Sequence, residues 1–275
     1  MPDIPLLDGQ DGARIPAIGL GTYDLRGAAG TAAVTTAIDA GYRLLDSAFN
    51  YDNEGAVGRA ARESGREDLV FTTKLPGRYH RHDLVRWAIE ESLFRSGLDR
   101  LGLVLIHWPN PEVGLYAEAW RALVEAREDG LVQMIGVSNF LPDHLDRIIG
   151  ETGVTPVLNQ IEVHPYWPQD DLRAADAERG ILTEGWSPLG KNSADADDPV
   201  VQRIAAAHDV SPRQLLLAWS VRLGVIPLPK SGDATRQAQN LDVMGIELTE
   251  DELAEIGDLR DADFVGADPA THQEF

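Results

Sequence analysis

Short apolar runs alternate along the chain with segments in which apolar residues recur at every third or fourth position. The runs are typical of strands, and the segments between them are typical of amphipathic helices. Most runs are apolar throughout, as expected for parallel strands buried on both faces. The eight strand-like runs cover residues 18–22, 44–48, 68–75, 101–108, 132–139, 157–163, 181–188 and 224–231.

This alternation predicts the α/β class and, within it, a (β/α)8 TIM barrel. Such barrels use ~250 residues as one domain, and this chain has 275. No long linker interrupts the pattern, so residues 1–275 are expected to form a single domain. The alternative is an open doubly wound sheet. Its phosphate fingerprint would need a third glycine after Gly19 and Gly21, where the chain has Asp24.

The two ends of the pattern add an N-terminal β-hairpin and a short C-terminal tail. Asp8-Gly9 and Asp11-Gly12 lie between apolar stretches, which predicts the hairpin. The tail follows Leu259. Within the barrel, Pro142 suits the first position of a helix, and Gly150 is expected to end that helix.

Composition excludes several classes of function. A net charge of −21 argues against nucleic-acid binding, which requires a basic face. The absence of cysteine excludes disulfides, thiolate catalysis and cysteine-based metal sites. No signal-peptide pattern and no apolar run of membrane-spanning length is apparent, so a cytoplasmic protein without a membrane partner is expected.

Lysine is rare in this chain, which makes its positions informative. Only three of the 24 basic residues are lysines, namely Lys74, Lys191 and Lys230. All three lie at or just beyond the carboxyl ends of predicted strands, on the face of a TIM barrel that carries the active site. Lysine differs from arginine in its compact ammonium group and its easily shifted pKa, so a chemical role is indicated.

Polar residues follow the other predicted strands at the same face. Asp46 follows the second strand, and Tyr51 lies on the loop after it, in the stretch LLDSAFNYDNE. Taken alone, this stretch also fits a capped strand-to-helix turn with a surface tyrosine. Asn53 and Glu54 would open the next helix. The remaining strand ends supply His107, Ser138, Asn139, Gln160, Trp186 and Ser187.

Together, Asp46, Tyr51, Lys74 and His107 resemble the catalytic tetrad of the aldo-keto reductases. The surrounding motifs agree from about Ile4 onwards. They are GLGTY, LLDSAFNYDNE, TTKL, LIHWP, GVSNF, LNQIEVHP, WSPLG and IPLPKS. The resemblance implies a barrel that reduces carbonyl compounds with NADPH and uses no metal.

The resemblance also implies a set of residues that bind the cofactor. Ser138, Asn139 and Gln160 would hold the nicotinamide carboxamide, and Trp186 would stack on the nicotinamide ring. Lys230, Ser231 and Arg236 would bind a 2′-phosphate. The other expected cofactor-binding residues are Gly21, Thr22, Tyr23, Ser187, Leu189, Lys191, Gln239 and Asn240.

Elementary chemistry gives each tetrad residue a task. Hydride addition to a carbonyl leaves an alkoxide that needs a proton, and Tyr51 is the expected general acid. A free tyrosine has a pKa near ~10, so a neighbouring Lys74 is expected to lower it. Asp46 would keep Lys74 charged. His107 would direct the carbonyl oxygen as a neutral hydrogen-bond donor.

Trp108 and Phe49 are expected to line an apolar substrate pocket. The short tail resembles that of bacterial diketogluconate-type reductases, which favours small aldehydes, dicarbonyls and keto sugars as substrates. Two other functions remain open: an aldolase that uses Lys74 as a Schiff base, and a catalytically weak barrel that binds NADPH for regulation. His80 and His82 lack an evident third ligand, so no metal site is expected. A monomer is expected.

Overall fold

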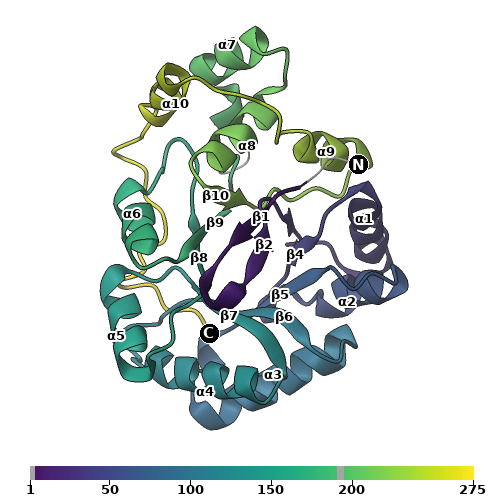
Figure 1. Cartoon of the computed structure of the whole chain (residues 1–275), viewed down its shortest axis with the longest axis vertical. Helices are drawn as coiled ribbons and strands as arrows, with labels where there is room; N and C mark the ends of the chain where they lie inside the picture. Colours follow the sequence, from purple (N-terminus) through teal and green to yellow (C-terminus); the bar gives the residue numbers. More distant parts are fainter. Residues whose placement is uncertain (1–3, 191–194) are drawn as a thin grey trace.

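The computed structural model describes residues 4–190 and 195–275, and it confirms the (β/α)8 barrel (Figure 1). Eight strands form one parallel sheet in the order β10-β9-β8-β7-β6-β5-β4-β3. All eight predicted strands are present. They are β3 (Leu20–Gly21), β4 (Leu44–Asp46), β5 (Val70–Leu75), β6 (Leu101–Ile106), β7 (Val132–Ser138), β8 (Leu158–Glu162), β9 (Leu182–Trp186) and β10 (Val225–Pro227).

The first and last strands of the sheet meet, which closes the barrel. Gly21 forms a parallel bridge with Lys230. The backbone N–H groups of Gly19 and Gly21 donate to the carbonyl oxygens of Pro227 and Pro229 at 3.1 and 3.2 Å. Closure satisfies backbone groups that an open sheet edge would leave unpaired.

Helices surround the barrel and pack on the outer faces of its strands (Figure 1). The first eight of them lie between strands, as the alternation predicts, and the last two follow the final strand. They are α1 (Gly27–Ala40), α2 (Glu54–Glu63), α3 (His82–Ser96), α4 (Tyr116–Glu128), α5 (Pro142–Thr152), α6 (Asp170–Glu178), α7 (Pro199–Ala207), α8 (Pro212–Arg222), α9 (Ala234–Leu241) and α10 (Glu250–Gly257).

Helix α5 begins at Pro142 as predicted, but the prediction that Gly150 ends it is wrong. The helix continues to Thr152. Gly153 ends it with a φ of 70° and donates its N–H to the carbonyl oxygen of Ile149 at 2.7 Å. A left-handed residue at this position terminates a helix, whereas Gly150 is a helical residue like its neighbours.

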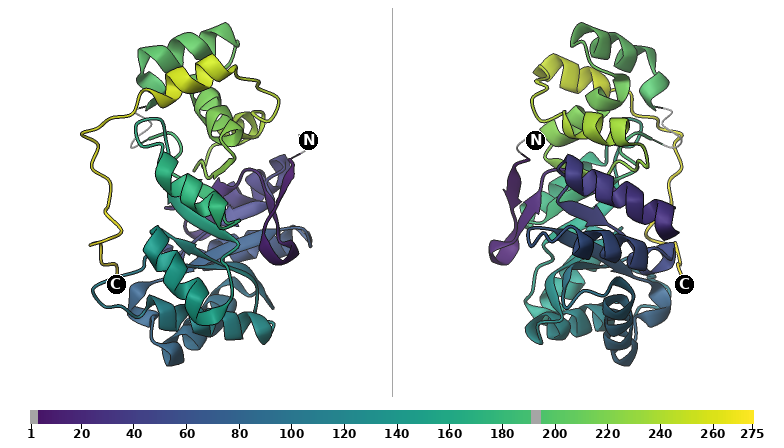
Figure 2. Two further views of the ribbon diagram at one scale, coloured as in Figure 1. Left: turned by 60° about the vertical axis from the view of Figure 1, so that its left-hand side comes forward. Right: turned by 90° about the vertical axis from the view of Figure 1, so that its right-hand side faces the viewer.

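The predicted hairpin is formed by β1 (Leu6–Asp8) and β2 (Arg14–Pro16), which pair antiparallel. Its Ile15 is fully buried and packs with strand residues of the inner core, including Leu44, Leu103 and Ile226. The hairpin therefore covers one end of the barrel. Figure 2 shows the tail after α10 running down the opposite side of the molecule.

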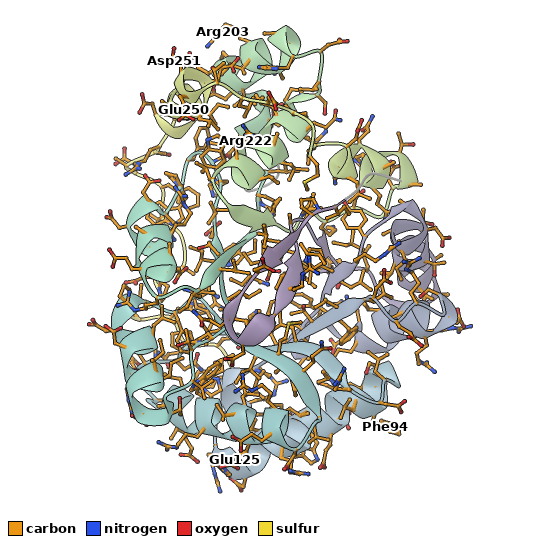
Figure 3. All side chains as sticks on the ribbon, in the orientation of Figure 1. Phe94, Glu125, Arg203, Arg222, Glu250 and Asp251 are labelled. Carbon is orange, nitrogen blue, oxygen red and sulfur yellow. The ribbon has the colours of Figure 1, made fainter. Side chains whose placement is uncertain are left out.

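The surface carries most of the charge. Arg203, Glu250 and Asp251 project outwards from α7 and α10 at one pole of the molecule (Figure 3). Within the described part of the chain, no helix combines the length and hydropathy of a membrane span.

Candidate active site

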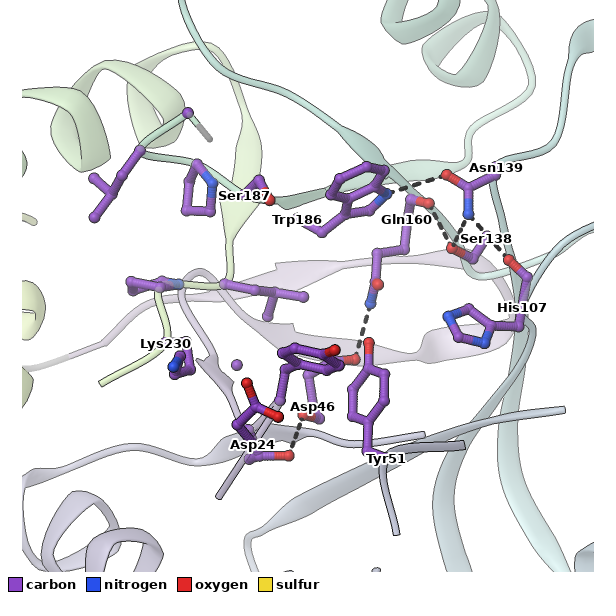
Figure 4. Close-up of a pocket in the computed structure, with 18 of the residues that line it drawn as sticks. Asp24, Asp46, Tyr51, His107, Ser138, Asn139, Gln160, Trp186, Ser187 and Lys230 are labelled. Carbon is purple, nitrogen blue, oxygen red and sulfur yellow. Dashed lines mark hydrogen bonds between the residues drawn. The ribbon is translucent and has the colours of Figure 1, made fainter. Parts of the chain in front are cut away.

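A cavity of about 770 Å³ lies at the carboxyl ends of the barrel strands (Figure 4). This is the end at which TIM barrels place their chemistry. The lining brings together residues that lie far apart in the sequence, from Gly21 to Lys230. They are Gly21, Thr22, Tyr23, Asp24, Asp46, Tyr51, His107, Trp108, Ser138, Asn139, Gln160, Trp186, Ser187, Pro188, Leu189, Gly190, Leu228, Pro229 and Lys230.

Lys74 lies behind the cavity wall in a buried ion pair. Strands β4 and β5 are parallel neighbours in which Asp46 pairs with Thr72, so Lys74, two residues further along β5, lies on the same side of the sheet as Asp46. Lys74 Nζ lies 2.6 Å from Asp46 Oδ1 and donates to the carbonyl oxygen of Ser47 at 2.9 Å. Burial is the largest single effect and disfavours the ammonium, but the charge and hydrogen bond of Asp46, together with the charges of Tyr51 and Glu184, outweigh it, and the pKa of Lys74 is raised. Lys74 is therefore held as a cation.

Tyr51 reaches this pair from the short 3-10 helix η2 (Phe49–Tyr51), which follows β4. Lys74 Nζ lies 3.4 Å from Tyr51 Oη. The hydroxyl faces the cavity, so Tyr51 is not the surface tyrosine of a simple turn.

The expectation that Lys74 lowers the pKa of Tyr51 below its ordinary value is wrong in this structure. Burial raises the pKa of Tyr51 by more than Lys74 lowers it, and the negative charge of Asp46 adds to the rise. Lys74 lowers the free-energy cost of forming the Tyr51 phenolate, but the protonated phenol remains the resting form. Tyr51 consequently keeps its proton, as a general acid must before it reacts.

The loop after Tyr51 is fixed from both sides. Asn53 precedes α2 but does not cap it through its side chain, contrary to expectation. Its Oδ1 instead accepts from Ser47 Oγ at 2.6 Å, and its Nδ2 donates to the carbonyl oxygen of Thr22 at 2.7 Å. Glu54 is buried and accepts from Thr73 Oγ1 at 2.6 Å. These bonds tie the Tyr51 loop to β3 and β5.

His107 follows β6 and faces Tyr51 across the cavity (Figure 4). The ring centroids of His107 and Tyr51 lie 6.1 Å apart. Asn139 Nδ2 donates to the backbone carbonyl oxygen of His107 at 3.0 Å, which fixes its main chain. His107 Nδ1 lies 2.9 Å from Oε1 of Glu274 in the tail, a charge contact outside good hydrogen-bond alignment.

Three polar residues expected to hold a carboxamide form one network. Ser138 Oγ donates to the backbone carbonyl oxygen of Gln160 at 2.8 Å. Asn139 Oδ1 accepts from Trp186 Nε1 at 3.1 Å, which orients the indole. The structure thus brings Ser138, Asn139, Gln160 and Trp186 together around the cavity.

Glu184 is a residue of this region that sequence reasoning missed. It lies fully buried on β9 below Trp186. Gln160 Nε2 donates to Glu184 Oε2 at 2.6 Å and to Asp46 Oδ1 at 2.9 Å. Burial, reinforced by the charge of Asp46, raises the pKa of Glu184 to about 8. The sequence did contain a signal for Glu184, because a glutamate within the predicted strand 181–188 is unusual for a buried strand.

The expected phosphate-binding residues lie at the other end of the cavity, near α9. Lys230 lines the cavity. Ser231 Oγ accepts from the N–H of Asp233 at 3.1 Å, and Asp233 caps α9 by accepting from the N–H of Arg236 at 2.9 Å. Arg236 Nε lies 3.8 Å from Asp233 Oδ1, and both side chains are about half exposed.

Only some of the residues expected to bind the cofactor line the cavity. Gly21, Thr22, Tyr23, Ser187 and Leu189 line the cavity. Ser231, Arg236, Gln239 and Asn240 are absent from the lining. Arg236 and Gln239 are exposed, while Ser231 and Asn240 are buried. Lys191 lies outside the described residues.

Phe49 does not line the cavity, so its assignment to the substrate pocket is wrong. The η2 turn directs its ring away from Tyr51 and against Tyr79, with ring centroids 5.2 Å apart. The guanidinium of Arg95 lies 3.9 Å from the centre of the Phe49 ring. Trp108 does line the cavity, and its ring packs on His272 of the tail at 4.1 Å between centroids.

No group of histidine and carboxylate side chains within residues 4–190 and 195–275 is arranged to hold a metal ion. His80 is buried on its own loop, and His82 is paired with Glu125 at 2.9 Å.

Comparison with known proteins defines the family. A family model described as the aldo/keto reductase family matches residues 17–261. This chain belongs to the aldo/keto reductase family. The aldo-keto reductase is 49% identical to 2,5-diketo-D-gluconic acid reductase B of Corynebacterium sp. over 277 residues, covering 100% of both chains.

Two further relatives extend the comparison. The aldo-keto reductase is 40% identical to methylglyoxal reductase DkgA of Escherichia coli over 263 residues, covering 94% of this chain and 95% of the relative. It also resembles the crystal structure of a Gox0644 mutant in complex with NADPH, with a TM-score of 0.94 and 38% identity. That match covers 98% of this chain and 99% of the other.

Proposed function

We propose that this aldo-keto reductase reduces aldehyde and ketone carbonyls with NADPH and that Tyr51 is the general acid. The observation that carries the assignment is the position of the Tyr51 hydroxyl. It faces the cavity and lies 3.4 Å from Lys74 Nζ, which is itself fixed 2.6 Å from Asp46.

The cavity residues fit a nicotinamide group. Gln160 gives its amide hydrogens to Asp46 and Glu184, which leaves its side-chain oxygen as an acceptor for a ligand carboxamide. Trp186, held by Asn139, offers an indole face for stacking. Lys230, Ser231 and Arg236 would hold the phosphate end. Bound there, NADPH would supply a hydride to the carbonyl carbon.

The protein supplies the proton and the charge stabilisation. As the carbonyl oxygen gains negative charge, the O–H bond of Tyr51 breaks and its proton passes to that oxygen, which completes the alcohol. Lys74 stabilises the phenolate that remains, and water later returns the proton to it. Asp46 keeps Lys74 charged throughout.

We propose small aldehydes, dicarbonyls and keto sugars as substrates. Two relatives are named for reduction of a diketo sugar acid and of methylglyoxal, which supports this range. Trp108 and Trp186 provide the apolar walls. Loss of nicotinamide absorbance with a panel of carbonyl compounds tests the proposal, and no carbonyl-dependent oxidation with any compound would refute it.

Neither alternative has comparable support. A Schiff base at Lys74 would need an accessible amine, yet the Lys74 side chain is 0% exposed and paired with Asp46. A regulatory NADPH-binding barrel would bind the cofactor and fail the same absorbance assay.

We further propose that residues 1–275 form one domain that acts as a monomer in the cytoplasm, with a carbonyl compound as its small-molecule partner. One continuous sheet and closely packed helices support the single domain. Sedimentation at working concentration tests the monomer.

A further inference from the structure

The end of the tail is fastened to the rim of the cavity. Asn110, on the loop after β6, donates from Nδ2 to the backbone carbonyl oxygen of Glu274 at 2.5 Å and accepts from the N–H of Glu274 at 3.1 Å. A side chain at Gly77 would come within 2.2 Å of the same carbonyl oxygen. The backbone at Glu274 therefore occupies a closely fitted place.

This attachment directs the Glu274 carboxylate to His107. Its Oε1 lies 2.9 Å from His107 Nδ1 and accepts from Asn50 Nδ2 at 2.5 Å. Its Oε2 accepts from the N–H of Gly77 at 3.4 Å. The side chains of His107 and Glu274 are each 15% exposed, so water screens their interaction only partly.

We propose that Glu274 is a positioning residue for His107, an inference that rests on the proposed function. The carboxylate attracts the proton on Nδ1 and so turns Nε2 towards the substrate carbonyl. A neutral imidazole carries one N–H, so with that proton on Nδ1 its Nε2 cannot donate. At this geometry His107 can donate to the carbonyl oxygen from Nε2 only when both ring nitrogens carry a proton, which differs from the neutral donor expected from the sequence.

The surroundings favour this charge state of the pair. Burial is the largest single effect on Glu274 and opposes its ionisation, but its contacts with His107, Asn50 and the N–H of Gly77 together outweigh burial, and the pKa of Glu274 is lowered. The other titratable groups near the pair are Tyr51 after β4, His80 after η3 (Gly77–Tyr79) and His272 in the tail, with Lys74 and Asp46 behind Tyr51.

The test compares Glu274→Gln with wild type. Glutamine keeps the size and the backbone bonds to Asn110 but removes the negative charge. We expect kcat for a neutral aldehyde to fall about tenfold, the scale of one charge-assisted hydrogen bond. The alkaline decline of kcat should move to lower pH, because the doubly protonated ring loses the carboxylate that faces Nδ1. The Kd for NADPH should stay unchanged.

A control variant and an NMR measurement distinguish failure of the positioning role from failure of the proposed function. Asp263→Asn removes an exposed tail charge and should leave kcat and its pH profile unchanged. Nitrogen-15 NMR of the His107 ring, recorded with NADP+ bound, reads the Nδ1 proton without any turnover. If wild type fails to reduce carbonyls, the proposed function fails, and the NMR spectra still report on the pair. An unchanged pH profile in Glu274→Gln, or an equal shift in Asp263→Asn, would overturn the positioning role.

Discussion

Tyr51 combines two properties that usually conflict in a proton donor. Its burial stabilises the protonated phenol, while the cation of Lys74 lowers the cost of the phenolate once the proton has left. The donor is thus charged only during the reaction, and its counter-ion is already in place. Electrostatic preorganisation of this kind needs little reorganisation when the charge develops.

Replacing Tyr51 with phenylalanine should separate acid catalysis from binding. The variant loses only a hydroxyl, so its fold and NADPH affinity should match wild type. Carbonyl reduction should fall by ~10²–10⁴, the range for a lost general acid. Single-turnover rates with several aldehydes provide the measurement. A near-normal kcat would remove Tyr51 from the chemistry and point to His107 as the acid.

The two aromatic residues assigned to the substrate pocket should now behave differently. Phe49→Ala should destabilise the fold by ~3–5 kcal/mol and leave KM for aromatic aldehydes nearly unchanged, because its ring packs against Tyr79 and Arg95. Trp108→Ala should raise that KM with little effect on NADPH affinity. Chemical denaturation and steady-state kinetics on both variants decide the matter. Similar KM values for the two variants would contradict the structural difference.

At the scale of elements, the N-terminus of α9 determines the charge available for a 2′-phosphate. Asp233 caps the helix and also lies near Arg236. The same carboxylate that stabilises the helix end would therefore compete for Arg236 with a phosphate bound there. Asp233 stands close to Ser231 and Arg236 in the sequence, so a negative charge near the expected phosphate site could be predicted from the sequence alone.

Substitutions at this helix end should move cofactor preference in opposite directions. Arg236→Ala should weaken NADPH binding about tenfold and leave NADH binding nearly unchanged. Asp233→Asn keeps a capping residue, removes the competing charge and should raise NADPH affinity about two- to fivefold. Kd values for both cofactors in the three proteins test this. Equal losses for NADPH and NADH in Arg236→Ala would refute the phosphate assignment.

Features determined by a run of apolar residues were predicted more accurately than features that depend on backbone angles or on a distant partner. The strands were predictable because burial on both faces requires a run of apolar residues. That Asp46, Lys74 and His107 share one face was predictable from the strand ends of a barrel, whereas the tetrad itself was inferred from the resemblance to a family. The direction of Phe49 and the end of α5 depend on local backbone angles that composition does not encode. Glu274 could not be foreseen, since its partner His107 lies 167 positions away and one acid in an acidic tail carries no distinguishing pattern.

Across the whole molecule, several buried groups respond to pH in the same direction. Burial raises the pKa of Asp176 to about 7 and that of Glu184 to about 8. Burial opposes protonation of His164, but its contacts with Asp195 and Glu162 together outweigh burial and raise the pKa of His164 to about 9. In all three, the folded state holds a proton more tightly than the unfolded state.

The free energy of unfolding should therefore decline as pH rises from about 5 to 9. A group with a raised pKa stabilises the fold fully below its unfolded pKa and loses that contribution as pH rises through its folded value. Thermal unfolding across this range measures the decline. Glu184→Gln cannot ionise, so it should flatten the curve below about pH 8. A Tm that is constant or rises towards pH 9 would contradict the prediction.

The meeting of Gly21 with Lys230 closes the barrel and also forms part of the cavity wall. A molecule bound in the cavity would contact both Gly21 and Lys230. It would therefore stabilise the junction between the first and last strands of the barrel. Hydrogen exchange at the Gly19 and Gly21 amides, which bond across this junction, should slow when NADPH binds. The cofactor would then determine how often the barrel opens as well as which reaction it performs.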